Sequence, residues 1–261
     1  MSDEILKSTT GDNVNAALIV IGDEILSGRT QDLNVSYLAV WLNDCGIQLK
    51  EVRIIPDDRD EIIATVQAMR GKYNYVFTTG GIGPTHDDIT AESIAAAFDT
   101  TLYSHPDAHK LLESYYGADD FTDARQRMTM VPHGADLIEN KVSIAPGFQI
   151  ENVFVLAGVP SIMQAMLEAL KPRLRGGNKM HSKTVVVTVA ESQIAGAVAE
   201  IQLAYEDVAI GSYPSMKRKE DGSLSYLVQL VVRGADPSAV VRCADALTIR
   251  CDQLGLDVLD D

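Results

Sequence analysis

Two adjacent aspartates, Asp87 and Asp88, follow a loop that contains three closely spaced glycines. These glycines are Gly80, Gly81 and Gly83. Glycine lets a backbone approach a ligand closely, and the N–H groups at the start of a following helix add partial positive charge. The residues therefore predict an anion-binding loop that carries two carboxylates. The simpler alternative is that the aspartates only cap the helix, since aspartate is a favoured N-cap residue.

A second pair of carboxylates, Asp23 and Glu24, follows the apolar run 16–21. In an open parallel sheet the carboxyl ends of the strands share one edge, so this pair is expected near Asp87 and Asp88. Four carboxylates beside an anion-binding loop resemble an oxygen-ligand site for Mg²⁺ or another hard cation. The alternative is that Asp23 and Glu24 are solvated loop acids.

The elements that must position these loops alternate between strands and helices. Apolar or β-favouring runs predict strands at 16–21, 47–55 and 75–79, and one-sided apolar spacing predicts helices at 33–45 and after Asp58. A β-α-β-α-β-loop-α order is typical of a parallel sheet covered on both faces. We therefore predict an α/β fold of three layers with a mostly parallel sheet.

A second junction between a strand and a helix lies further along the chain. The segment 104–130 is predicted to be mostly helical, and 136–139 and 152–156 are predicted strands on either side of a rigid turn at 145–148. The helix that begins near Pro160 offers a second anion-binding N-terminus.

Two arginines near the end of the helical segment, Arg125 and Arg127, have side chains long enough to reach a phosphate. Ordinary surface arginines are the alternative.

The C-terminal part has a different element order. The segment 173–178 is predicted to be a linker, and 181–261 is predicted to be a smaller α+β domain with a β-α-β-β-α-β order. This order is typical of a split βαβ layer. Residues 1–13 are expected to be disordered, and 14–175 to form the larger domain.

Composition excludes several classes of protein. The net charge of −15 argues against broad binding to nucleic acid or to an anionic membrane, because both need a positive field. No apolar run approaches the roughly 20 residues of a membrane span, and the N-terminus lacks the apolar region of a signal peptide, so we expect a cytoplasmic protein. The three cysteines are scattered and predict neither disulfides nor zinc binding.

Several short motifs occur along the sequence in an order that is typical of one family. They are Gly22-Asp23-Glu24-Ile25-Leu26-Ser27-Gly28, Asp32-Leu33-Asn34, the long word from Thr78 to Thr90, Ala145-Pro146-Gly147-Phe148 and Gly158-Val159-Pro160-Ser161. Together they resemble the molybdopterin-binding-like domain of competence/damage-inducible protein A, which is similar to the MoaB/MogA group and to the N-terminal domain of eukaryotic FAD synthases. The likeness covers about residues 14 to 175.

The second part resembles the small KH-like domain that follows in the same proteins, and the word 210–214 is its most telling piece. It lacks a G-x-x-G clamp, so RNA binding is not implied. The chain also ends without the amidohydrolase domain of the full-length relatives, so deamidation of nicotinamide mononucleotide is not expected. Leu33, Ala157 and Ile162 depart from the residues usual in the family, which puts the substrate in doubt.

The resemblance implies a phosphorylated ligand with a planar ring, either a pterin such as molybdopterin or an adenine dinucleotide. It implies catalytic roles for Asp23, Glu24, Asp87 and Asp88, and binding of Mg²⁺, Mn²⁺ or Co²⁺ by Glu24, Asp87 and Asp88. The positions at which it places ligand contacts are Gly22, Ser27, Gly28, Asn34, Thr79, Gly80, Gly81, Gly83, Pro84, Thr85, Pro146, Gly147, Gly158, Pro160 and Ser161.

Three functions remain open on these grounds. The first is metal-dependent cleavage of ADP-ribose or FAD at the diphosphate. The second is molybdopterin binding or adenylylation in molybdenum cofactor biosynthesis. The third is a nucleotide-binding module without turnover. Relatives with this domain are commonly oligomeric, so a homo-oligomer is expected.

Overall fold

The computed structural model describes residues 14–218 and 224–259. The predicted disordered start, 1–13, lies outside the described residues. The chain divides into two compact units, Met1–Asn178 and Lys179–Asp261, and each is described separately below.

The larger unit is built on a six-stranded sheet with the strand order β2-β1-β3-β8-β7-β6. The first four strands in this order are parallel, and β7 and β6 are antiparallel to their neighbours. The strands are β1 (Asn15–Ile21), β2 (Gln48–Ile55), β3 (Tyr75–Thr79), β6 (Asp136–Ile138), β7 (Gly147–Ile150) and β8 (Val153–Leu156). The predicted α/β class with a mostly parallel sheet is confirmed.

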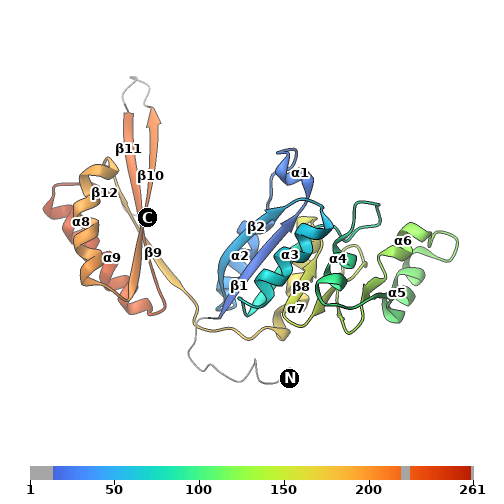
Figure 1. The fold of residues 1–261 in the computed structure, drawn as a ribbon. Coiled ribbons are helices and arrows are strands. Elements are labelled where there is room, and N and C mark those ends of the chain that lie inside the picture. Colours follow the sequence, from blue (N-terminus) through green and yellow to red (C-terminus); the bar gives the residue numbers. More distant parts are fainter. Residues whose placement is uncertain (1–13, 219–223, 260–261) are drawn as a thin grey trace. The chain divides into compact units, whose positions relative to one another are not determined.

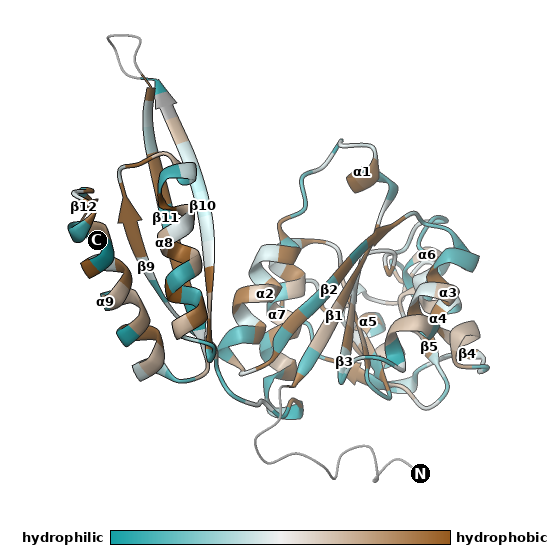
Figure 2. Ribbon diagram, turned by 60° about the vertical axis from the view of Figure 1, so that its left-hand side comes forward, coloured by the Kyte–Doolittle hydropathy of each residue, from teal (hydrophilic) through white to brown (hydrophobic). Residues whose placement is uncertain are grey.

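Helices cover both faces of this sheet, and the central strand β1 shows why. Its residues alternate between two cores: Ile19 and its neighbours on one face pack against α3 (Arg59–Arg70) and α4 (Thr90–Ala97), and Leu18 and its neighbours on the other pack against α2 (Asn34–Asp44) and α7 (Pro160–Leu170). Both residues are fully buried, and the strands at the centre of the sheet are largely brown in Figure 2. An uninterrupted apolar run is what such a doubly covered strand requires.

Two regular segments of the larger unit were not expected from the sequence. The acids after β1 form a short helix, α1 (Asp23–Leu26), where only a loop was predicted. The second half of the predicted turn at 145–148 instead begins strand β7, since Gly147 pairs with Ile138 on β6. A strand was missed there because it has only four residues and begins with glycine, which is unfavourable in strands.

Between α4 and β6 the chain makes an excursion from the sheet, at the green end of Figure 1. It contains a two-stranded antiparallel sheet and two helices. These elements are β4 (Leu102–Ser104), α5 (Pro106–Tyr116), α6 (Asp123–Arg127) and β5 (Met130–Pro132). The mostly helical prediction for 104–130 is confirmed, although β4 and β5, at three residues each, are too short to be recognised from sequence.

The smaller unit is an antiparallel sheet with the strand order β10-β11-β9-β12 and two helices packed on its core residues. Strands β9 and β10 both pair with β11, which lies between them, so the split βαβ prediction is confirmed. The elements are β9 (His181–Val187), α8 (Glu191–Ala204), β10 (Val208–Arg218), β11 (Leu224–Gly234), α9 (Pro237–Gln253) and β12 (Val258–Leu259). Over the residues that the structure describes, no helix has the length and apolar character to cross a bilayer.

Candidate functional site

The carboxyl ends of four parallel strands are tied together at one edge of the sheet. At the end of β1, Gly22 donates its backbone N–H to Ile55 of β2 at 3.1 Å. At the end of β3, Gly80 donates to Leu156 of β8 at 3.2 Å, and a Cβ at Gly80 would collide with the carbonyl oxygen of Ile21. The loops after these strands therefore lie side by side, as the parallel-sheet argument predicts.

The glycine loop needs its glycines for backbone reasons. Gly80 and Gly81 have φ angles of 103° and 65°, a region that side chains disfavour. The buried Thr90, at the start of α4, donates its hydroxyl to the Gly80 carbonyl at 3.0 Å and its N–H to the Gly81 carbonyl at 3.0 Å. A Cβ at Gly81 would strike that hydroxyl, so the loop lies tightly against the helix.

The interpretation of Asp87 and Asp88 as helix caps is wrong. The residue that precedes α4 is Ile89, and no side chain caps the helix. Asp88 instead accepts two hydrogen bonds from Thr85, one from its N–H at 2.7 Å and one from its hydroxyl at 2.5 Å. This carboxylate is therefore fixed inside the glycine loop, where a Cβ at Gly83 would lie 2.7 Å from its Oδ2.

Asp57, at the end of β2, is a carboxylate of this edge that the sequence reasoning overlooked. It is half-buried and accepts the backbone N–H of Asp23 at 3.0 Å. Burial raises its pKa, and the negative charges of Asp23, Glu24 and Asp87 raise it further, whereas the hydrogen bond from Asp23 lowers it. Asp57 could have been predicted from the parallel strand order, because β2 ends at the same edge of the sheet as β1 and β3.

The other acids of the cluster are more exposed. The Glu24 carboxylate folds back over its own loop, since a Cβ at Gly22 would lie 2.5 Å from Oε2. Asp87 lies 3.8 Å from His86 Nδ1. Asp23, Glu24, Asp57 and Asp87 are thus close enough for their charges to interact, and they are hard oxygen donors.

The donor set suits a divalent cation, with one restriction. Across residues 14–218 and 224–259, no three histidine, cysteine, aspartate or glutamate side chains are gathered closely enough to bind a metal ion by themselves. Mg²⁺ usually keeps several waters and uses one or two carboxylates together with substrate phosphates. The residues present therefore fit a metal that is completed by water and ligand oxygens.

The second strand-to-helix junction lies against the glycine loop. A Cβ at Gly158 would be 3.3 Å from the Gly80 Cα, so the two loops are in contact. Asn34, at the start of α2, donates its side-chain amide to the Gly158 carbonyl at 2.7 Å and thereby positions this junction. Pro160 is the first residue of α7, and Ser161 is exposed beside it.

The remaining predicted contact residues differ in burial. Thr79 is buried at the end of β3, and neither its hydroxyl nor the Asn34 Oδ1 has a hydrogen-bond partner among the described residues. Pro146 lines a cavity beside the glycine loop. Among the predicted contacts on the loops after β1 and β3, the exposed ones are Ser27, Gly28, Pro84 and Thr85.

Gly147 has a structural reason to be glycine. It is buried in β7, where a Cβ would collide with the carbonyl oxygen of Val155 on β8. Close approach to strand β8, rather than to a ligand, accounts for this residue, so the sequence-based argument for a ligand contact at Gly147 is not needed.

These features define a class of protein: a doubly covered α/β domain whose glycine loop and carboxylates meet at the carboxyl ends of parallel strands. The family described as "Probable molybdopterin binding domain" matches residues 17–176, and the chain belongs to this family. The family described as "FAD synthase, middle domain" matches residues 179–255.

Individual relatives agree with this assignment. The chain is similar to a "CinA-like protein" of Desulfosudis oleivorans, 34% identical over 186 residues that cover 67% of this chain and 45% of the relative. It is similar to a "Probable FAD synthase" of Caenorhabditis briggsae, 29% identical over 235 residues that cover 80% of this chain and 45% of the relative. The chain thus matches less than half of either relative.

A solved structure is also similar, the crystal structure of the protein CinA from Thermoplasma acidophilum. Its sequence identity is 34% and its TM-score 0.59, over 62% of this chain and 98% of that chain. The resemblance drawn from the sequence words is therefore confirmed.

Proposed function

We propose that the unit up to Asn178 is a divalent-metal-dependent pyrophosphohydrolase that cleaves the diphosphate of an adenine dinucleotide or of ADP-ribose. The observation that carries the proposal is the contact of a backbone anion loop, Gly80–Gly83, with the carboxylates of Asp57 and Asp88. The charges of Asp23, Glu24 and Asp87 also act on Asp57, so the loop borders a cluster of acids. Similarity to proteins described as FAD synthases supports a ligand of the nucleotide class.

Each part of the site has a task in such a reaction. The glycine loop supplies backbone N–H groups for phosphate oxygens. A metal bound by the acids would neutralise phosphate charge and lower the pKa of a coordinated water. Asp57 has a raised pKa and is half-buried, so it is suited to accept the proton of the attacking water. Asp88, fixed by Thr85, would orient that water or hold the metal.

The second candidate function is molybdopterin binding or adenylylation in molybdenum cofactor biosynthesis. The match of residues 17–176 to a molybdopterin-binding family favours it. A pterin with a phosphate would use the same glycine loop, but the chemistry would join a nucleotide rather than cleave a diphosphate.

A direct assay separates these functions. The purified chain is incubated with FAD or ADP-ribose and Mg²⁺, Mn²⁺ or Co²⁺, and AMP is measured by chromatography. We expect release of AMP that stops with EDTA, and Asp88→Ala should lower the rate by at least about 100-fold. Asp60→Ala is the matched control, because Asp60 is an exposed acid of helix α3 that pairs with the neighbouring Arg59. Retained pterin without AMP release would favour the second function.

Metal binding has a separate readout in thermal stability. A ligand that binds only the folded state at about one hundred times its Kd stabilises it by about 2.7 kcal/mol. We expect Mg²⁺ or Mn²⁺ to raise the Tm of the wild type and of Asp60→Ala, but not of Asp88→Ala. An equal rise in all three proteins would place the metal elsewhere.

A further inference from the structure

A cavity opens beside the glycine loop, between the start of helix α4 and the excursion that contains β4, α6 and β5. The loop contributes Gly81, Ile82 and Gly83 to its wall. The excursion contributes Leu102, Met128 and Met130. The excursion thus lies against the glycine loop, although helix α4 separates the two in the sequence.

The cavity shares Asp88 with the acidic site but adds an apolar wall. The acids Asp88 and Glu92 line its side toward helix α4, and most of its other lining side chains are apolar. Phe148 and Val131 form a buried part of the wall, and Met128 and Met130 are half-buried. Methionine adapts its shape and makes favourable contacts with aromatic rings. An apolar cavity with a few polar groups is the usual surrounding of a flat organic ring.

One cation lines this cavity, the guanidinium of Arg127 at the end of α6. Among the described residues no hydrogen-bond or ion-pair partner of this guanidinium is found. Arg125, two positions earlier, is in a different situation, because it stacks on the Tyr116 ring at 4.0 Å and donates to the Asp120 carbonyl at 2.5 Å. The same short helix therefore carries one arginine engaged in the fold and one that faces a cavity.

We propose that this cavity is the subsite for the planar heteroaromatic ring of the ligand, and that Arg127 is the residue that positions the ring. The guanidinium is flat and weakly hydrated, so it stacks on a ring or donates to ring nitrogen and oxygen atoms. Gly81 and Gly83 belong to the anion loop and also line the cavity. A ring in the cavity would therefore lie next to a phosphate bound at the loop. The inference rests on the proposed function and names its ring-binding part.

Binding of small probes tests the proposal without turnover. AMP and FMN each carry a ring and one phosphate, and ribose 5-phosphate carries the phosphate alone, so none of the three contains a diphosphate to cleave. Dissociation constants are measured by titration calorimetry with Mg²⁺ present. We expect the wild type to bind AMP or FMN more tightly than ribose 5-phosphate, and whichever of the two binds more tightly identifies the ring.

The variants then assign the effect to Arg127. Arg127→Ala should weaken binding of the preferred ring compound by about tenfold and leave ribose 5-phosphate unchanged. Arg127→Lys should not restore the affinity, because an ammonium lacks the planar face. Arg125→Ala, the matched control, should bind all three probes as the wild type does.

Several results would overturn the subsite. Equal losses of ring-compound affinity in Arg127→Ala and Arg125→Ala would mean that α6 had merely been disturbed. Full affinity in Arg127→Lys would mean that Arg127 contributes only its positive charge. If AMP is released from FAD but Arg127→Ala leaves both KM and ring binding unchanged, the subsite is wrong and the hydrolase stands. If ring binding depends on Arg127 and no AMP is ever released, the subsite stands and the hydrolase is wrong.

Discussion

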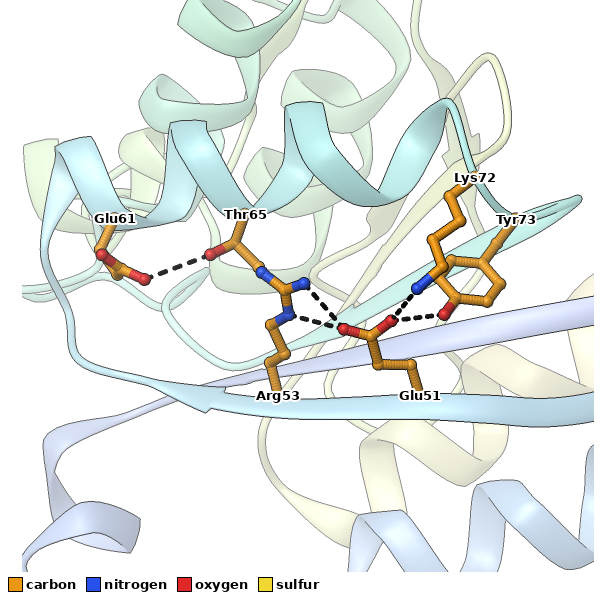
Figure 3. Close-up of polar contacts among 6 residues, drawn as sticks. All are labelled: Glu51, Arg53, Glu61, Thr65, Lys72 and Tyr73. Atoms are coloured by element: carbon orange, nitrogen blue, oxygen red, sulfur yellow. Dashed lines mark hydrogen bonds and ion pairs between the residues drawn. The ribbon is translucent and has the colours of Figure 1, made fainter.

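Two carboxylates associated with strand β2 have opposite surroundings. Glu51, within the strand, is surrounded by donors: Lys72 at 2.7 Å, Arg53 at 2.8 Å and the hydroxyl of Tyr73 (Figure 3). These hydrogen bonds, that of Lys72 first, lower the pKa of Glu51 to about 2. Asp57, just after the strand, is half-buried, and its pKa is raised by this burial first and then by the charges of neighbouring acids.

The difference separates a carboxylate used for structure from one available for chemistry. The Glu51 carboxylate already accepts hydrogen bonds from Arg53, Lys72 and Tyr73, so it is not available to bind a ligand. Asp57 is left with burial and like charges that disfavour its ionised form, and such perturbed groups are enriched at functional sites. A bound cation would relieve the repulsion at Asp57, whereas it would find the charge of Glu51 already neutralised.

The largest effect is expected when the Asp57 carboxylate is removed, because the proposed reaction uses it. Asp57→Asn keeps an oxygen that can accept the N–H of Asp23 but removes the charge and the proton acceptor. We expect the metal-dependent release of AMP from FAD or ADP-ribose to fall by at least about 100-fold. The Tm without metal should stay the same or rise, because a repulsive charge has been removed.

The matched control is Asp58→Asn, at the neighbouring position. Asp58 caps helix α3 by accepting the N–H of Glu61 at 2.9 Å, and asparagine is an equally good cap. Its activity should remain close to that of the wild type. If Asp57→Asn retained full activity, the raised pKa of Asp57 would have no part in the reaction.

The sequence predicted the edge of the sheet but not all of its members. The runs at 16–21 and 75–79 are so apolar that a doubly covered parallel sheet was the natural interpretation, and from it followed the meeting of the Asp23 and Asp88 loops. The same argument applied to Asp57. It was overlooked because the neighbouring Asp58 offered a complete local explanation as a helix cap.

The features that could not be predicted from the sequence depend on contacts between segments that are distant along the chain. Gly147 was read as a place for a ligand, yet its lack of a side chain is required by the Val155 carbonyl on the next strand. Arg125 and Arg127 are equivalent in sequence, and only the fold gives one a ring to stack on and the other a cavity. Tertiary neighbours of this kind leave no trace in local spacing.

The next test acts on the structural carboxylate. Glu51→Gln removes the charge that Lys72 and Arg53 contact, so we expect the Tm to fall by about 1–3 °C at neutral pH and low salt. Activity at a temperature well below the Tm should not change. Thermal denaturation and the AMP assay on the same preparation measure both, and a loss of activity without a loss of stability would contradict the division into two kinds of carboxylate.

The smallest expected effect is an opposite dependence of stability on pH. The folded pKa of Glu51, about 2, lies below its ordinary value of 4.5, so its contribution to stability is present above pH 4.5 and is lost as the pH falls toward 2. The folded pKa of Asp57 lies above its ordinary value of 3.8, so its contribution is present below pH 3.8 and is lost as the pH rises through the folded pKa. In metal-free buffer, the Tm deficit of Glu51→Gln should therefore shrink in acid, and any Tm gain of Asp57→Asn should appear only as the pH rises. Parallel curves for both variants would mean that the two carboxylates do not differ in the folded state.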